Sequence, residues 1–96
     1  MKDYKTVAVE TYRNKGEASS AQIRVRPLPG QGFPVDMKVE FSRKTRELHP
    51  VGTVFVIQAS VVDRGSSSFL YSSYQWPCKV IARSKAVELI ASGKLS

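Results

Sequence analysis

Apolar and polar residues alternate along much of the chain with a period of two, which is typical of β-strands that bury one face and expose the other. The clearest case is Gln22–Pro27, where Ile23 and Val25 alternate with Arg24 and Arg26. We predict a strand here, with its two arginines on the solvent face.

The longest predicted strand, Thr53–Val62, has apolar residues on both faces, which indicates a central position in a sheet. Residues 63–68 form the predicted hairpin loop, with Gly65 at a position of positive φ. The returning arm, Phe69–Trp76, is rich in aromatic rings, and Pro77 should end its pairing. Together the two arms predict one β-hairpin.

The remaining segments are mostly β as well. Their content of β-forming residues and their alternation predict three more strands, at Tyr4–Tyr12, Met37–Phe41 and Cys78–Ala82. Two helices are expected from capping residues and apolar spacing: a short one over Ser42–His49, and a C-terminal one over Ser84–Ser92 with Ser84 as its N-cap, Ala86, Val87 and Ile90 on one face, and Gly93 at its end.

These elements predict a mainly β fold: a small antiparallel five- or six-stranded barrel or rolled sheet, with a short helical turn and a C-terminal helix. A barrel removes most of the exposed strand edges that endanger a small β protein. The chain has 96 residues, which is the size of one domain, and we expect residues 1–96 to form it.

The chain is strongly basic, with 15 Lys and Arg against 8 Asp and Glu and a formal net charge of +7. Such a surplus is typical of proteins that bind a polyanion, and it also suits an acidic protein or an anionic membrane surface. No apolar run is long enough for a membrane span, so no membrane partner is expected. Cys78 is the one cysteine, which favours a reducing, cytoplasmic location.

Residues that could carry out catalysis do not converge in the sequence. His49 precedes a proline at a turn, Cys78 is expected to be a small buried apolar residue, and the carboxylates are scattered. No cluster has metal-ligand spacing, and Gly30-Gln31-Gly32 lacks the context of a dinucleotide loop. We therefore predict a protein that is not an enzyme and has no cofactor or metal.

Cations, by contrast, gather on predicted surfaces. Arg24 and Arg26 lie about 7 Å apart on one strand face, from the rise per residue. Lys38 would join them if its strand pairs with theirs. The candidate phosphate-binding residues are Arg24, Arg26 and Lys38 on strands, and Arg43, Lys44 and Arg46 on the short helix.

The aromatic arm adds a candidate for base stacking. Leu70, Tyr74 and Trp76 share one face and are expected to fill the core, whereas Phe69 and Tyr71 share the other. Exposed aromatic rings on a basic β surface stack on nucleotide bases in single-strand-binding barrels. Tyr71 is the ring that we expect to be exposed.

The sequence therefore favours non-enzymatic binding of nucleic acid, DNA or RNA, through a basic β face. The alternative is a protein-interaction or homo-oligomerisation module, such as a homodimer, that uses an uncovered sheet edge or packs its C-terminal helix against another chain. Phosphate binding weakens as salt rises, whereas an apolar interface does not, so salt separates the two hypotheses.

Overall fold

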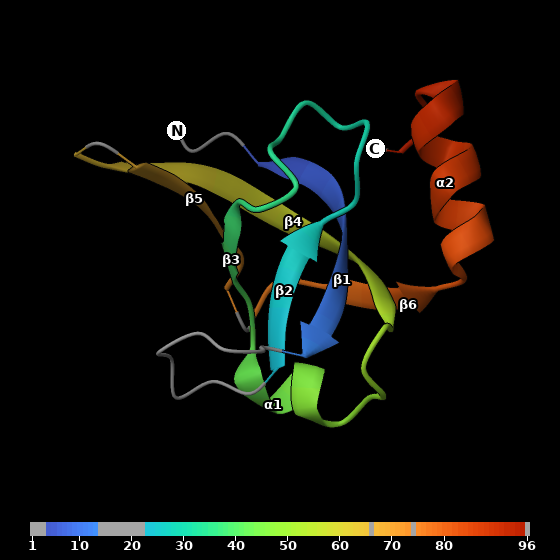
Figure 1. Ribbon diagram of the computed structural model, residues 1–96, viewed down its shortest axis with the longest axis horizontal. Coiled ribbons are helices and arrows are strands. Elements are labelled where there is room, and N and C mark those ends of the chain that lie inside the picture. The colour runs from blue at the N-terminus through green and yellow to red at the C-terminus, as the bar shows by residue number, and fades with distance from the viewer. Residues whose placement is uncertain (1–3, 14–22, 66, 74, 96) are drawn as a thin grey trace.

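The computed structural model describes residues 4–13, 23–65, 67–73 and 75–95 (Figure 1). This part of the chain forms six strands: β1 (Lys5–Arg13), β2 (Ile23–Pro27), β3 (Lys38–Glu40), β4 (Val54–Arg64), β5 (Ser67–Tyr71) and β6 (Cys78–Ile81). It also forms two helices, α1 (Arg43–Glu47) and α2 (Arg83–Ser92). The predicted mainly β fold with a short helical turn and a C-terminal helix is confirmed.

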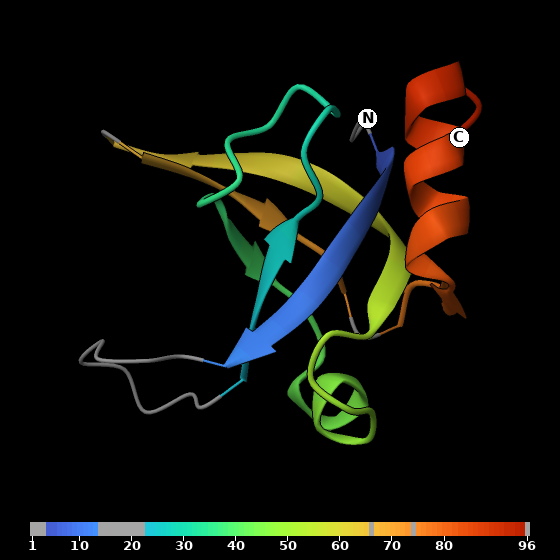
Figure 2. The ribbon, with the colours of Figure 1, turned by 45° about the vertical axis from the view of Figure 1, so that its right-hand side comes forward.

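The strands form one curled sheet in the order β2-β1-β4-β5-β3, and β6 pairs with β4 beside this path. The end strands β2 and β3 approach each other, so the sheet is a nearly closed barrel (Figures 1 and 2). The sheet is mostly antiparallel, as expected, but it is mixed, because β3 and β5 pair in parallel. The chain reverses direction twice between them, once into β4 and once at the hairpin, and therefore returns in the direction of β3.

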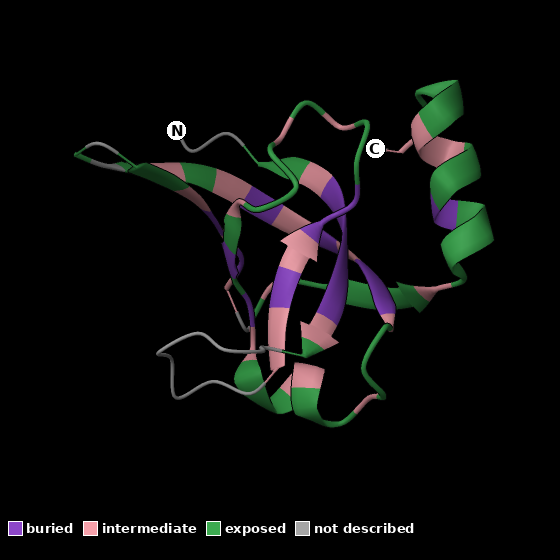
Figure 3. Ribbon diagram, in the orientation of Figure 1, coloured by how far each residue is buried: buried purple, intermediate pink, exposed green. Residues whose placement is uncertain are grey.

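Strand β4 buries apolar side chains on both faces, as its sequence predicts. Its inner face contributes Phe55, Ile57 and Ala59 to the barrel core, all nearly or fully buried. On its outer face Val54 joins a second cluster with Ala8 of β1 and Ala86 of α2. Helix α2 thus packs against the outside of its own barrel (Figures 2 and 3), and this contact uses the apolar face that could otherwise pack in trans.

The side chain of Gln31 replaces a strand neighbour of β1 at the point where β2 ends. Its Oε1 accepts a hydrogen bond from the Ala8 backbone N–H at 2.8 Å, and its Nε2 donates to the carbonyls of Ala8 and Leu28, both at 2.8 Å. Gly30 has φ of 92°, and an added Cβ would lie 3.1 Å from Ile90 Cγ2 of α2. The Pro- and Gly-rich loop after β2 therefore has a structural purpose: it places this amide against β1.

The returning arm of the hairpin is interrupted, contrary to the expectation of one strand over Phe69–Trp76. Ser60 pairs with Tyr71 and Ile57 pairs with Cys78, so β5 and β6 do not follow each other in one continuous register along β4. Ser72 is buried, and its N–H donates to the Glu40 carbonyl at 2.8 Å. The ladder between β5 and β3 thus continues one residue beyond the last pair with β4, and pairing on β4 resumes with β6.

The helix ends agree with the sequence at two of three predicted caps. The Ser42 hydroxyl accepts from the Thr45 N–H at 3.2 Å and begins α1, and Gly93, with φ of 69°, ends α2. The predicted Ser84 cap is wrong: Ala82 is the N-cap of α2 and makes no side-chain hydrogen bond. Val87 is 53% exposed and does not share the buried face of Ala86. In the described residues no helix has the length and apolar character needed to cross a membrane.

We predict that Gln31→Ala lowers the free energy of unfolding by about 1–3 kcal/mol, because it leaves the N–H of fully buried Ala8 without an acceptor. Urea unfolding measures the loss. Val35→Ala, at a 53% exposed position in the same connecting segment, serves as the control and should change little. Equal unfolding midpoints for the Gln31 variant and the wild-type protein would show that water replaces the amide without cost.

Candidate nucleic-acid interface

The outer faces of β1 and β2 bring the two predicted strand arginines beside acidic and aromatic residues. In the register of this pair, Glu10 lies opposite Arg26 and Tyr12 lies opposite Arg24. Arg26 Nε donates to Glu10 Oε2 at 3.0 Å, and its guanidinium carbon lies 4.5 Å from the centroid of the Tyr12 ring. Arg26 is therefore held by a carboxylate and a ring of its own sheet.

Glu10 also accepts a hydrogen bond from Arg83, the first residue of α2, and so ties β1, β2 and α2 together. Only 12% of its side chain is exposed. Burial raises the pKa of Glu10, but hydrogen bonds from Arg83 and Arg26, together with their charges, outweigh burial and hold that pKa below its ordinary value. The carboxylate thus stays ionised and offsets part of the positive charge of the two arginines.

Helix α1 carries three of the predicted cations in two different situations. Arg43 Nε donates to Glu47 Oε2 at 3.2 Å on the exposed side of the helix, and Lys44 is exposed to solvent. Arg46 is half-buried, and its Nε is buried without a hydrogen-bond partner. An unmade hydrogen bond at a buried charged group is costly, and the described residues supply no acceptor for this Nε.

Arg46 also faces the charges of two other arginines. Burial lowers the pKa of Arg46, the charge of Arg43 lowers it further, Glu47 partly compensates, and the charge of Arg24 lowers it again. Arg24 lies near the start of β2, which lies beside α1 (Figures 1 and 2). Arg24, Arg43 and Arg46 thus form one group, which we call the arginine cluster.

Lys38 lies apart from the arginine cluster. Strand β3 pairs with β5 and not with β2, so the condition for Lys38 to join the strand arginines is not met. Its side chain is exposed at a groove of about 820 Å³ between the inner side of the hairpin and the loop before β3. The groove is lined by Phe33, Pro34, Asp36, Met37, Lys38, Glu40, Val61, Ser67, Ser68 and Phe69. Its two acidic residues make it a poor extension of a phosphate track.

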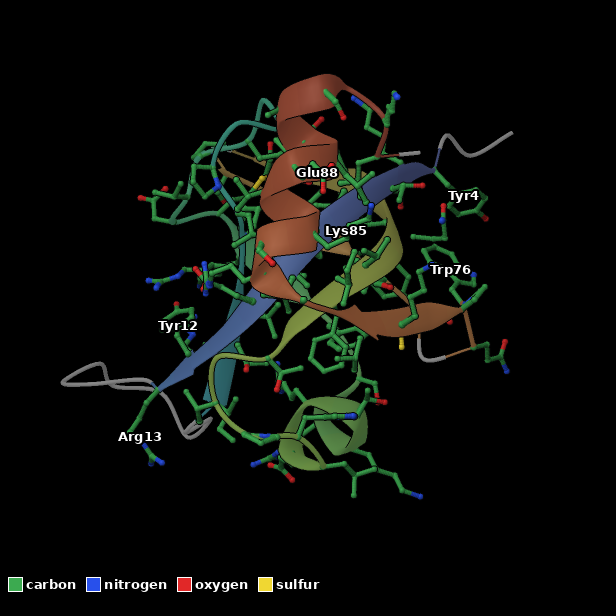
Figure 4. All side chains as sticks on the ribbon, turned by 90° about the vertical axis from the view of Figure 1, so that its right-hand side faces the viewer. Tyr4, Tyr12, Arg13, Trp76, Lys85 and Glu88 are labelled. Atoms are coloured by element: carbon green, nitrogen blue, oxygen red, sulfur yellow. The ribbon has the colours of Figure 1, made fainter. Side chains whose placement is uncertain are left out.

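Tyr71 belongs to an aromatic group on another side of the molecule. Its ring is half-buried and meets the Trp76 ring edge-to-face at 5.6 Å, and Trp76 meets Tyr4 in the same way at 4.6 Å. Figure 4 shows Tyr4 and Trp76 on the opposite side of the barrel from Tyr12. A surface that includes both Arg26 and Tyr71 is therefore not formed.

The other aromatic residues of the arm divide between core and surface. Leu70 is fully buried, as predicted, whereas Trp76 is half-buried in the interruption between β5 and β6 and does not share a strand face with Leu70. Phe69 is half-buried on β5. Tyr74 lies outside the described residues.

The two residues considered for nucleophilic chemistry do not meet. His49 Nδ1 lies 3.0 Å from the Thr45 carbonyl, and its ring packs edge-to-face on Phe55 at 5.1 Å. The expectation that Cys78 is buried is wrong: β6 is an edge strand at this point, and Cys78 is exposed. Partial burial of the sulfur still raises the pKa of Cys78 and opposes thiolate formation. Among the described residues no three His, Cys, Asp or Glu side chains group as a metal site.

Sequence reasoning missed the residues that hold Arg26 within the fold. Glu10, Tyr12 and Arg83 decide that Arg26 is engaged within the fold. One signal was present in the sequence, because Glu10 is the one acidic residue in the first predicted strand. Its partner on α2 is far away in the chain and has no local signal.

No protein-family model matches this chain, and comparisons with curated proteins and with solved structures give no match either.

We predict that Glu10→Gln destabilises the protein by an amount of order 1 kcal/mol at neutral pH, because the charged hydrogen bonds to Arg26 and Arg83 weaken. The native pKa of Glu10 is below its unfolded value, so its contribution is present above the unfolded pKa and is lost as pH falls through the native pKa. Urea unfolding of both proteins at about pH 7 and about pH 3 measures this.

The difference in stability between wild type and Glu10→Gln should shrink at the lower pH. Glu88→Gln is the matched control, since Glu88 pairs with Lys85 at 3.7 Å on the exposed side of α2. A difference that is the same at both pH values would mean that the Glu10 charge does not stabilise the fold.

Proposed function

We propose that the protein binds nucleic acid without catalysis, through the arginine cluster and the neighbouring Lys44. One observation carries this proposal: the Arg46 guanidinium is half-buried beside like charges, and its buried Nε has no acceptor. A phosphate group would add negative charge to that of Glu47 and would supply acceptor oxygens for the guanidinium groups.

The arrangement of the surrounding charges supports the same surface. Arg43 has one exposed partner, Glu47, and an exposed pair of this kind contributes little, so it competes weakly with a phosphate. Lys44 extends the positive charge along α1. The net charge of +7 would draw a polyanion towards the molecule and make the interaction dependent on salt.

The other predicted residues take lesser parts in this proposal. Arg26 is 43% exposed and adds positive potential beside Arg24, but its Nε is committed to Glu10. Lys38 and Tyr71 lie elsewhere on the barrel and are not assigned to the phosphate surface. Both DNA and RNA carry the phosphates that the cluster would bind.

One observation favours the alternative function of protein interaction. Strand β6 is an edge strand whose one pairing within the described chain is with β4, and its Val80 is 52% exposed. An exposed edge of this kind accepts an extended segment of a partner through main-chain hydrogen bonds. Binding of that type would survive salt concentrations that release a phosphate ligand.

We predict that the double variant Arg24→Ala with Arg46→Ala weakens binding to oligonucleotides and flattens the dependence of log affinity on log salt by about 1–2, as expected when two phosphate contacts are lost. Fluorescence anisotropy at several salt concentrations, with single- and double-stranded probes, measures both effects.

Lys79→Ala with Lys94→Ala is the matched control, because it removes two exposed positive charges at β6 and after α2. It should leave the salt slope nearly unchanged. An unchanged slope for the arginine variant, or an equal change in the control, would contradict the assignment of the surface.

A further inference from the structure

A second surface lies on the outer face of the sheet, where a groove of about 430 Å³ runs between α2 and strand β6. Ile81 of β6 lies opposite Val54 of β4, and both pack in the outer cluster that α2 covers. Lys79, two residues before Ile81, projects from the same face of β6. Figure 4 looks onto this face, with α2 at its left and Trp76 at its right.

The groove combines an apolar floor with a rim of one sign of charge. Half-buried apolar side chains from β4, β6, α2 and the segment after α2 form the floor: Val56, Ile81, Leu89 and Leu95. The charged residues of its described lining are all lysines: Lys79, Lys85 and Lys94. A groove of this kind favours a ligand that carries both apolar and acidic groups.

Two of these lysines are accessible and are not engaged in ion pairs. Lys85 lies 3.7 Å from Glu88 on α2, so its charge is partly compensated. Lys79 and Lys94 are exposed to solvent, and the ion pairs among the described residues do not include them. An acidic group can therefore approach both from outside without displacing another carboxylate.

Strand β6 adds main-chain groups to this surface. Its one pairing within the described chain is with β4. Every second residue of a strand directs its N–H and C=O to the same side, so part of the backbone of β6 faces away from β4. Such an edge accepts an added strand. An added strand would also cover the exposed side chain of Val80.

We propose that β6 and this groove bind an extended acidic segment of a partner protein, which adds one strand to the sheet. Residues that lie opposite each other on neighbouring strands project from the same face and contact each other. The segment would therefore place an acidic residue opposite Lys79 and apolar residues opposite Val80 and Ile81. This inference goes beyond nucleic-acid binding, because it concerns another surface and another class of partner.

The charge of the rim also argues against a second copy of this chain as the occupant. If β6 paired with the β6 of another copy, the lysine rims of two molecules would approach each other, and like charges across an interface are unfavourable. The apolar floor suits a polypeptide better than a phosphate backbone. An acidic segment satisfies the edge, the floor and the rim together.

The test uses fluorescent synthetic peptides and measures binding by anisotropy at low salt. The main probe, Ser-Glu-Val-Val-Glu-Val-Val-Glu-Ser, presents an acid next to two apolar residues in either strand direction. One comparison peptide has Lys in place of each Glu, and the other has Ser in place of each Val. We expect the main probe to bind about tenfold more tightly than either, because charge and apolar contact both contribute. Amide hydrogen exchange of residues 78–81 should slow when it binds.

Charge reversal in the protein locates the site. Lys79→Glu should weaken binding of the main probe by about threefold to tenfold and strengthen binding of the lysine peptide. Lys38→Glu is the matched control, since Lys38 is an exposed lysine on strand β3 and should keep the wild-type affinity. Thermal unfolding of both variants establishes that the fold is intact.

Several results would overturn this inference: no binding of the main probe, equal affinity for all three peptides, unchanged exchange in β6, or equal effects of the two variants. A stable dimer in light scattering, with the β6 amides protected before peptide is added, would also overturn it, because the edge would then belong to a second copy. None of these results bears on Arg24 or Arg46, so the proposed function is tested separately.

Discussion

The fold depends on the need of β4 to bury both of its faces. A strand in a simple barrel has one face in the core and one in solvent, but β4 presents Phe55 and Ile57 to the inside and Val54 to the outside. The inner face closes the barrel, and the outer face requires a cover, which α2 provides through Ala86. The same strand pairs with β1 and β6 over Val54–Ile57, so neither of its edges is open there.

The position of α2 in turn brings a second arginine to the carboxylate of Glu10. Because the helix begins directly after β6, its first residue, Arg83, reaches the carboxylate of Glu10, which already holds Arg26. One buried acid thus engages two arginines from two elements and keeps them on the sheet. Among the described residues beside α1, Glu47 binds Arg43 at the exposed side of the helix.

Local patterns predicted most of the elements, because alternation and capping are properties of neighbouring residues. The strand at Ile23–Pro27, the Ser42 cap and the positive φ of Gly65 and Gly93 follow from such patterns. The parallel pairing of β3 with β5 and the interruption between β5 and β6 do not, since they depend on contacts between distant segments. The start of α2 likewise follows strand β6 and the Glu10 contact, and the local serine does not set it.

At the candidate site, too, the sequence predicted what depends on local patterns and missed what depends on contacts between distant segments. Composition predicted a basic surface, and the positions of the cations on the predicted elements named all three members of the arginine cluster. A sequence cannot tell a cation that a buried carboxylate neutralises from one whose Nε is buried without an acceptor. Arg26 and Arg46 look alike in the sequence, and the fold places one against Glu10 and the other in a desolvated corner. A buried guanidinium nitrogen without an acceptor costs stability. In the proposed function a phosphate ligand brings acceptor oxygens to this guanidinium, and for this reason Arg46 carries more of the proposal than the more exposed cations.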